Sequence, residues 1–268
     1  MKPKAILFDM DGTLLPDDKK ITRYTAECLT KAHDLGIRLV ASTGRPPFLL
    51  DRMFLQAGLE NTIDAYIALN GVGHLDKILG INELSNYLEG SWIPGIMERV
   101  EQLGFEGTSV SYRYVDAWIT KKDKFFFQSY NSRFPNLHFT DFKAEKDEKF
   151  WKLIFGLERA FTVEEIERLD SLANENYHGF LSLPNSYEFT NAKVSKGNGV
   201  KRFAEEHGFA LEDLVMFGDS GNDIDAMKLV GYSIAMGNAG IKTKEISDEI
   251  TQSNNNDGVA RWIAKELL

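Results

Sequence analysis

The sequence has little of what marks secreted and membrane proteins. Cys28 is the single cysteine among 268 residues, so neither an intramolecular disulfide nor a cysteine-rich zinc site can form. No uncharged apolar run approaches the roughly 18 residues that span a bilayer. The amino terminus reaches Asp9 after only four apolar residues, which is too short for the core of a signal peptide. These absences favour a soluble cytoplasmic protein without a membrane partner.

Basic residues are also in the minority. Lysine and arginine number 31 against 40 aspartates and glutamates, which gives a formal net charge of −9. Domains that bind nucleic acids usually carry a basic stripe, so we expect no nucleic-acid partner. Hydrophobic residues make up 43% of the chain and charged residues 26%, which excludes a disordered or collagen-like protein. The length suits roughly two domains.

Strand and helix patterns alternate at both ends of the chain. Apolar runs typical of buried parallel strands occupy residues 5–8, 37–41, 65–69, 214–217 and 232–235. Helices are expected from Thr22 to Gly36, from about Pro46 to Gly58, over 223–230, and from about Gly258 to the end. This alternation predicts an α/β fold, with a Rossmann-like parallel-sheet core built from residues 1–82 and 191–268.

Residues 83–190 have a different texture and contain most of the aromatic residues. Strand-like patterns occur at 109–119 and 150–157, and Thr162 with Glu165 forms the pattern of a capping box at a helix start. We therefore expect an inserted second domain with an α+β fold.

The first candidate site is the segment Asp9-Met10-Asp11-Gly12-Thr13, directly after the first strand. Open parallel sheets build their sites at the carboxyl ends of strands. Two carboxylates in one place repel each other unless a cation or a shared proton is present, and Mg²⁺ is a suitable cation. Gly12 permits a sharp turn, and Thr13 is expected to hydrogen-bond locally. The alternative is a solvated Asp-Gly turn.

The second candidate site is Gly218-Asp219-Ser220-Gly221-Asn222-Asp223, which also follows an apolar strand. If the two strands are neighbours, an oxygen-rich pocket suited to Mg²⁺ forms from Asp9, Asp11, Asp219 and Asp223. The alternative for Asp223 is that it caps the following helix.

Two further segments carry groups that favour anions. Thr43 and Gly44 lie between a strand and a helix, where hydroxyl and amide donors often hold a phosphate, although the same residues also form ordinary helix caps. Lys196 lies where the chain returns from the insertion and could neutralise both a phosphate and the aspartates. Asn70-Gly71, after the third strand, is either a turn or a pocket-lining amide.

Taken together, these segments resemble the four ordered motifs of the haloacid dehalogenase-like (HAD) phosphatase superfamily. The order of the motifs, and the insertion between Asn70 and Lys196, look like the Cof-type branch with its C2B-type cap domain. The resemblance implies that residues 83–190 are a cap that selects the substrate.

The resemblance also implies a role for each motif residue. Asp9 would attack phosphorus and become an aspartyl phosphate, while Asp11 would protonate the leaving alcohol and then activate water. Mg²⁺ would be held by Asp9, the Asp11 carbonyl and Asp219. The transferring phosphoryl group would be bound by Thr43, Gly44 and Lys196, and Asn222 and Asp223 would contact phosphate or metal-bound water.

The expected function is therefore Mg²⁺-dependent hydrolysis of small phosphorylated metabolites. Sugar phosphates are the leading substrate class, and flavin mononucleotide and pyridoxal phosphate are alternatives. A phosphomutase would use the same intermediate, and a receiver-type signalling domain would accept a phosphoryl group without turnover. The second acid, Asp11, and the long insertion argue against the signalling domain. Dehalogenation is disfavoured because displacement at carbon needs neither Asp11 as an acid nor Thr43 as a phosphate donor.

Overall fold

A computed structural model describes residues 2–105, 108–113, 116–119, 136–139 and 147–268. The chain divides into two compact units, the first formed by Met1–Ser85 with Val194–Leu268 and the second by Asn86–Lys193. The sequence pattern predicts divisions after residues 82 and 190, each three residues before the division in the structure. No helix in the described part of the chain is long and apolar enough to cross a membrane.

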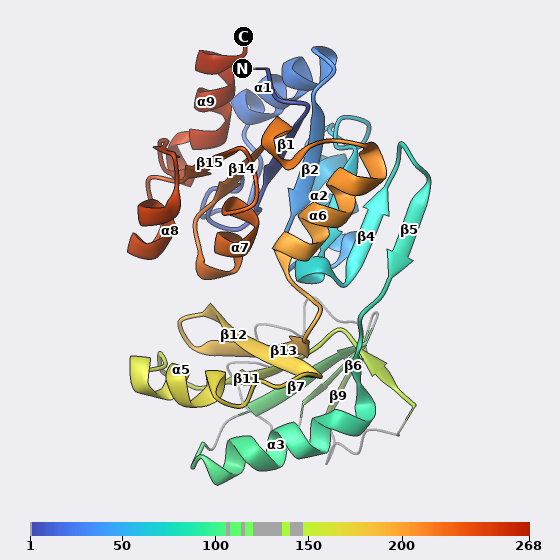
Figure 1. Cartoon of the computed structure of the whole chain (residues 1–268), viewed down its shortest axis with the longest axis vertical. Helices are drawn as coiled ribbons and strands as arrows, with labels where there is room; N and C mark the ends of the chain where they lie inside the picture. Colours follow the sequence, from blue (N-terminus) through green and yellow to red (C-terminus); the bar gives the residue numbers. More distant parts are fainter. Residues whose placement is uncertain (1, 106–107, 114–115, 120–135, 140–146) are drawn as a thin grey trace. The chain divides into compact units, whose positions relative to one another are not determined.

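The first unit is built on an eight-stranded sheet with the order β16-β15-β14-β1-β2-β3-β4-β5 (Figure 1). Six strands are parallel: β1 (Ala5–Phe8), β2 (Arg38–Ser42), β3 (Ala65–Ala68), β14 (Leu214–Gly218), β15 (Tyr232–Ala235) and β16 (Glu249–Ile250). The apolar runs of the sequence form the central strands, whose side chains are almost all buried. The expected Rossmann-like α/β core is confirmed.

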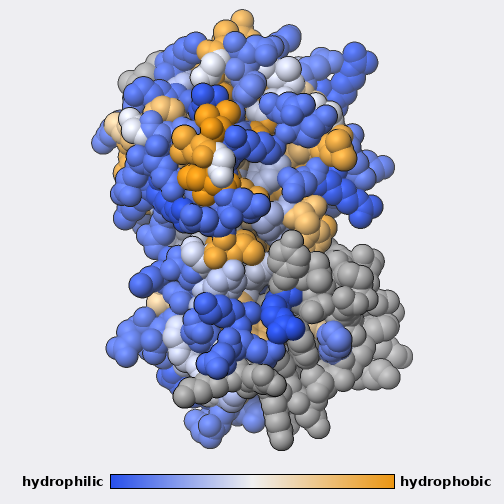
Figure 2. All heavy atoms as spheres, turned by 90° about the vertical axis from the view of Figure 1, so that its right-hand side faces the viewer, coloured by the Kyte–Doolittle hydropathy of each residue, from blue (hydrophilic) through white to orange (hydrophobic). Residues whose placement is uncertain are grey.

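The sheet is not wholly parallel, because β4 (Gly73–Asp76) and β5 (Ile81–Leu84) add an antiparallel hairpin at one edge. Asp76 closes the turn of this hairpin by accepting hydrogen bonds from the backbone N–H groups of Ile78 and Leu79, each at 2.9 Å. The apolar pattern of the sequence does not predict this hairpin, because β5 is short and has no apolar run. Figure 2 views the chain from the side on which β4 and β5 lie in Figure 1. Hydrophilic side chains predominate on this surface and apolar ones form a few groups, as is usual for proteins.

Helices cover both faces of this sheet. Along the sheet, successive strands run outward in one direction from β1 through β2 to β3, and in the other direction from β14 through β15 to β16. Because the crossovers between parallel strands are right-handed, the helices that connect these two sets of strands lie on opposite faces of the sheet. The helices are α1 (Arg23–Asp34), α2 (Pro47–Gln56), α6 (Lys196–His207), α7 (Ile224–Met227), α8 (Ile241–Ile246) and α9 (Gly258–Glu266). Short 3-10 turns are η1 (Leu69–Gly71), η3 (Leu211–Asp213), η4 (Gly221–Asp223) and η5 (Asn254–Asn256).

Two helix predictions have different outcomes. Thr22 caps α1 as expected, accepting a hydrogen bond from the Thr25 N–H at 3.0 Å. The helix expected over 223–230 is shorter, because η4 precedes it and α7 ends at Met227.

The second unit contains a six-stranded sheet with the order β12-β13-β11-β7-β8-β9. Its strands are β7 (Thr108–Arg113), β8 (Asp116–Ile119), β9 (Asn136–Phe139), β11 (Lys152–Gly156), β12 (Tyr177–Leu183) and β13 (Ser186–Asn191). A separate pair joins β6 (Leu88–Glu89) to β10 (Lys149–Phe150). The helical elements are η2 (Gly90–Trp92), α3 (Ile93–Gln102) and α5 (Val163–Asp170), and residues from both α-helices share a buried apolar cluster with the sheet.

The α+β character expected for the insertion is present in this unit. The capping box at α5 is confirmed, since Thr162 Oγ1 accepts from the Glu165 N–H at 3.2 Å and a Glu165 carboxylate oxygen accepts from the Thr162 N–H at 2.9 Å. The single strand expected over 109–119 is two antiparallel strands, β7 and β8, and residues 114–115 lie outside the described part of the chain. The strand expected over 150–157 divides into β10 and β11.

Candidate active site

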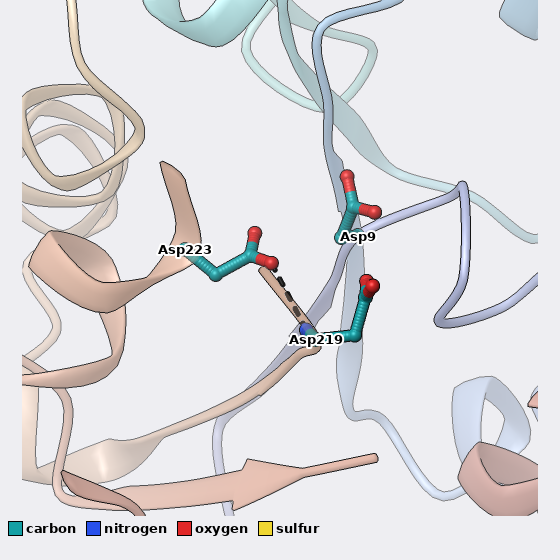
Figure 3. Close-up of side chains that lie close together, drawn as sticks. All are labelled: Asp9, Asp219 and Asp223. Carbon is teal, nitrogen blue, oxygen red and sulfur yellow. Dashed lines mark hydrogen bonds between the residues drawn. The ribbon is translucent and has the colours of Figure 1, made fainter. Parts of the chain in front are cut away.

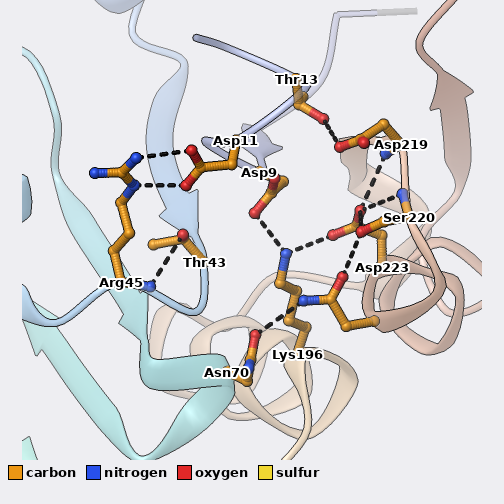
Figure 4. A network of polar contacts seen from close by, with 11 residues as sticks. Asp9, Asp11, Thr13, Thr43, Arg45, Asn70, Lys196, Asp219, Ser220 and Asp223 are labelled. Carbon is orange, nitrogen blue, oxygen red and sulfur yellow. Dashed lines mark hydrogen bonds and ion pairs between the residues drawn. The ribbon is translucent and has the colours of Figure 1, made fainter. Parts of the chain in front are cut away.

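The candidate active site lies where the central parallel strands of the first unit end (Figure 4). Phe8 of β1 pairs in register with Phe217 of β14 and with Ala41 of β2. The residues that follow these strands therefore meet at one edge of the sheet, as strand ends do in open α/β folds. In this way Asp9, Thr43 and Asp219 come close together from distant parts of the sequence.

Three carboxylates form a tight cluster at this edge (Figure 3). One oxygen from each of Asp9, Asp219 and Asp223 lies within 4.8 Å of the other two. Asp9 and Asp223 are buried, and Asp219 is partly buried. Hard divalent cations such as Mg²⁺ prefer carboxylate oxygens, so the donor set of this cluster fits Mg²⁺.

Two carboxylates of the cluster, Asp9 and Asp219, hold protons more tightly than free aspartates do. Burial raises the pKa of Asp219 to about 6, and the negative charge of Asp223 adds to this effect. Burial also raises the pKa of Asp9, to about 8, and Asp223 and Asp219 act in the same direction, while Lys196 opposes them. Like charges in a buried place are costly without a counter-ion, so bound Mg²⁺ would replace protons here.

Lys196, the first residue of α6, is buried between two of these carboxylates. Its Nζ lies 2.6 Å from Asp9 Oδ1 and 2.5 Å from Asp223 Oδ1. Burial by itself lowers the pKa of Lys196, but the charges of Asp223 and Asp9 outweigh it and hold the pKa above its usual value. The side chain is therefore an ammonium ion at the centre of the site.

Both carboxylate oxygens of Asp223 are engaged by protein donors. Oδ1 pairs with Lys196, and Oδ2 accepts from the N–H groups of Asp219 and Ser220, each at 3.0 Å. Asp223 thus closes the 3-10 turn η4 and does not cap α7 with its side chain. It holds both Lys196 and the loop that carries Asp219.

The side chain of Asp11 is outside the carboxylate cluster. Arg45 binds it in a bidentate manner, with Nε 2.5 Å from Oδ2 and Nη2 2.7 Å from Oδ1, and Lys19 Nζ lies 2.9 Å from Oδ1. Burial by itself would raise the pKa of Asp11, but these two cations lower it to about 2. Asp11 is therefore a carboxylate directed away from Asp9 in this state. Arg45 follows the expected phosphate-binding residues Thr43 and Gly44, but no pattern in the sequence predicts that Arg45 and Lys19 bind Asp11.

The loop after β1 is fixed by contacts that are distant in sequence. Thr13 Oγ1 donates to Asp219 Oδ1 at 2.8 Å, so the expected local bond of Thr13 is wrong. Gly12 has φ of +83°, and a Cβ there would lie 2.5 Å from Asp219 Oδ2, which explains the glycine. The amides of Asn238 and Asn254 donate to the carbonyls of Gly12 and Leu15, at 2.8 and 2.9 Å. No motif in the sequence signals these two asparagines.

The residues expected to bind phosphate differ in whether their donor groups are already bound by other protein groups. Thr43 is buried, and its Oγ1 accepts from the Arg45 N–H at 3.2 Å. The N–H of Gly44 has no acceptor among the residues that the structure describes. Asn222 donates from Nδ2 to Asn70 Oδ1 at 3.1 Å, and its Oδ1 accepts from Ser220 Oγ at 2.7 Å. The amide of Asn222 is therefore tied to other protein groups.

The raised pKa values predict how metal binding depends on pH. Mg²⁺ must displace protons from Asp219 and Asp9, so we expect its affinity to rise with pH, by up to about tenfold per unit for each proton displaced. We expect the opposite trend for the stability of the metal-free protein. Its folded state binds these protons more tightly than the unfolded chain, so the free energy of unfolding should fall as pH rises from about 4 through the raised pKa values of Asp219, about 6, and Asp9, about 8.

Thermal unfolding from pH 5 to 8, with and without Mg²⁺, measures both trends. Asp219→Asn should abolish most of the Mg²⁺-induced rise in Tm and keep the bond from Thr13. A Mg²⁺ effect that does not change with pH, or that persists in Asp219→Asn, would contradict the assignment of this cluster.

Comparison with known proteins agrees with the geometry. A family model described as haloacid dehalogenase-like hydrolase matches residues 6–263. Phosphatase YwpJ of Bacillus subtilis (strain 168) is 29% identical over 99% of this chain and 100% of its own length. The 5-amino-6-(5-phospho-D-ribitylamino)uracil phosphatase YcsE of the same organism is 27% identical over 99% of this chain and 96% of its own length.

Solved structures share the fold over almost the whole chain. The sugar phosphatase BT4131, of HAD subclass IIB, superposes with a TM-score of 0.81 at 22% identity and covers 98% of each chain. The match of the family model, over residues 6–263, includes most of both segments of the first unit and the whole insertion between them. Because the family model matches almost the whole chain, and the strand-end aspartates and the buried lysine agree with it, the chain belongs to the haloacid dehalogenase-like hydrolases. It is a Cof-type phosphatase of that superfamily.

Proposed function

We propose that this phosphatase is a Mg²⁺-dependent phosphomonoester hydrolase that acts on small phosphorylated metabolites through an aspartyl phosphate. The main support is the convergence of Asp9, Asp219 and Asp223, two of which contact Lys196, at the edge of the sheet where the Gly44 N–H has no acceptor among the described residues. Such a site combines a carboxylate nucleophile with positive charge and an amide donor for phosphoryl oxygens.

In the first step Asp9 attacks phosphorus, and the bond from phosphorus to the leaving oxygen breaks. The proton that the leaving alkoxide needs comes from Asp11. In the second step Asp11 takes a proton from water, the water oxygen attacks phosphorus, and Asp9 is released as a carboxylate. Lys196, Thr43 and the Gly44 amide bind the phosphoryl oxygens throughout, with Asn222 and Asp223 supporting them.

Mg²⁺ would be held by the carboxylates of Asp9 and Asp219 and by the Asp11 carbonyl, with Asp223 next to them. When bound, it reduces the repulsion between the nucleophile and the anionic substrate.

Asp11 has to change partners during this cycle. Arg45 and Lys19 stabilise its carboxylate form, which is the form required of a base. To act as an acid it must first bind a proton, so we propose that its side chain leaves Arg45 when the substrate's leaving oxygen is present.

This role predicts the effect of Asp11→Asn. We expect the rate of the first step to fall most for esters with poor leaving groups, about 10² to 10⁴-fold, and much less for aryl phosphates, whose leaving oxygen needs no proton in that step. Single-turnover rates with a sugar phosphate and with para-nitrophenyl phosphate measure the difference. Equal losses for both esters would contradict the role of Asp11 as the acid.

Sugar phosphates are the proposed substrate class, and the second unit is the proposed cap that selects among them. The similar protein YcsE is a phosphatase of a ribitylamino compound, and BT4131 is a sugar phosphatase. Both names describe phosphate esters of polyhydroxylated carbon chains. Flavin mononucleotide, which also has a ribityl chain, and pyridoxal phosphate complete the set of candidates.

Phosphate release from a panel of sugar, nucleotide and cofactor phosphates, with Mg²⁺ or with EDTA, tests this function. We expect release that requires Mg²⁺, with sugar phosphates ranking highest. Isomeric sugar phosphate without free phosphate would indicate a phosphomutase. Failure to release phosphate from every metabolite and from activated aryl phosphates would overturn the proposal.

A further inference from the structure

Three consecutive residues at the end of β3 adopt left-handed backbone conformations. The φ angle is +53° at Leu69, +56° at Asn70 and +111° at Gly71. A leucine seldom adopts this conformation, and such strain persists only where the surrounding structure holds it in place. The neighbouring segments must therefore hold the backbone of η1 in this conformation.

The left-handed turn directs two backbone donors at the neighbouring loop. The Leu69 N–H donates to the Arg45 carbonyl at 3.1 Å, and the Asn70 N–H donates to the Thr43 carbonyl at 2.9 Å. The carbonyls on both sides of Gly44 are thus fixed, while the Gly44 N–H between them has no acceptor in the described part of the chain. The turn holds the loop in a conformation that leaves this amide available to an anion.

The side chain of Asn70 joins this loop to the loop that follows β14. Asn70 is buried, and its Oδ1 accepts the hydrogen bond from Asn222 Nδ2 (Figure 4). A Cβ added at Gly44 would lie only 3.3 Å from Asn70 Nδ2, so the Asn70 amide packs against this glycine. One amide thus contacts both phosphate-binding segments that the sequence predicts.

The turn also abuts the start of α6. A Cβ on Gly71 would lie 2.6 Å from the Ser195 carbonyl, so glycine allows the two backbones to pack closely. Ser195 caps α6 directly before Lys196, accepting from the Asn198 N–H at 3.1 Å. The segments that carry Gly44, Asn222 and Lys196 therefore all meet at η1.

We propose that Asn70 is a positioning residue: it joins the Thr43–Arg45 loop to Asn222 and so holds the Gly44 amide where this amide binds the transferring phosphoryl group. This inference rests on the proposed function. It assigns Asn222 an indirect role, because both ends of its amide are bound by Asn70 and Ser220.

Binding of inorganic phosphate in the presence of Mg²⁺, measured by calorimetry, tests the proposal. Asn70→Gly removes the amide and keeps a residue that tolerates the left-handed backbone, and Asn222→Ala removes the other half of the contact. We expect each variant to weaken phosphate binding about tenfold, and the double variant to be no weaker than either, because one link is lost in all three. Asn61→Gly, in an exposed turn, is the matched control.

Two accompanying readouts separate positioning from a general loss of structure. Mg²⁺ affinity without phosphate, and Tm without ligand, should stay close to those of the wild type in Asn70→Gly. Unchanged phosphate affinity in Asn70→Gly, or losses that multiply in the double variant, would overturn the proposal. So would a wild-type protein that does not bind phosphate. If the wild type binds phosphate with the predicted pattern but hydrolyses no ester, the positioning role stands and the proposed function fails.

Discussion

Replacing Asp9 by asparagine is expected to lower phosphate release by about 10⁴-fold or more while the fold is retained. An amide has nearly the shape of the carboxylate and can still accept the hydrogen bond from Lys196, but it is a very poor nucleophile toward phosphorus. Steady-state phosphate release on the best ester of the panel measures the loss.

The same substitution should not lower the stability of the protein. Burial disfavours the charged form of Asp9, so a neutral amide removes that cost, and we expect the Tm of the metal-free Asp9→Asn variant to equal or exceed that of the wild type. Asp34→Asn, at an exposed position in α1, is the matched control and should keep full activity. Residual turnover within tenfold of the wild type would exclude Asp9 as the nucleophile.

Replacing Lys196 by methionine is expected to have the largest effect on stability. Methionine fills similar space, but Asp9 and Asp223 then lose the ammonium ion that both contact. Breaking a buried ion pair by removing one partner typically costs about 3 to 5 kcal/mol. Activity should fall by about 10³-fold, because phosphoryl oxygens lose a buried cation. Chemical denaturation and single-turnover kinetics measure the two effects.

A second substitution separates these effects. In Lys196→Met with Asp223→Asn, one uncompensated carboxylate is removed, and the asparagine oxygen can still accept from the N–H groups of Asp219 and Ser220. Most of the stability should return while activity stays low. Lys201→Met, at an exposed position on the same helix, should change neither. Recovery of activity in the double variant would show that Lys196 acts only on stability.

Much of the first unit can be predicted because its strands are strongly apolar. Buried parallel strands need continuous apolar runs, and β1, β2, β3, β14 and β15 all have them. Short polar strands carry no such signal, so the sequence does not predict β4, β5 and β16.

The position of the site follows from the same logic, but its internal contacts do not. Strand ends of a parallel sheet meet, so Asp9, Thr43 and Asp219 are predictable neighbours. The pairing of Asp11 with Arg45 depends on side-chain directions, for which the spacing of residues in the chain gives no rule. The bond from Asn222 to Asn70 spans 152 positions and joins two uncharged amides, which no charge or hydropathy pattern reveals.

The residue that carries the phosphoryl group during turnover tests the proposed mechanism most directly. The Asp11→Asn variant, mixed with Mg²⁺ and para-nitrophenyl phosphate and quenched in acid, should accumulate the intermediate, because the aryl leaving group needs no acid and the second step lacks its base. Peptide mass spectrometry should then find one phosphoryl group on Asp9. Phosphate release by this variant without phosphorylation of Asp9, or a phosphoryl group on another residue, would contradict the mechanism.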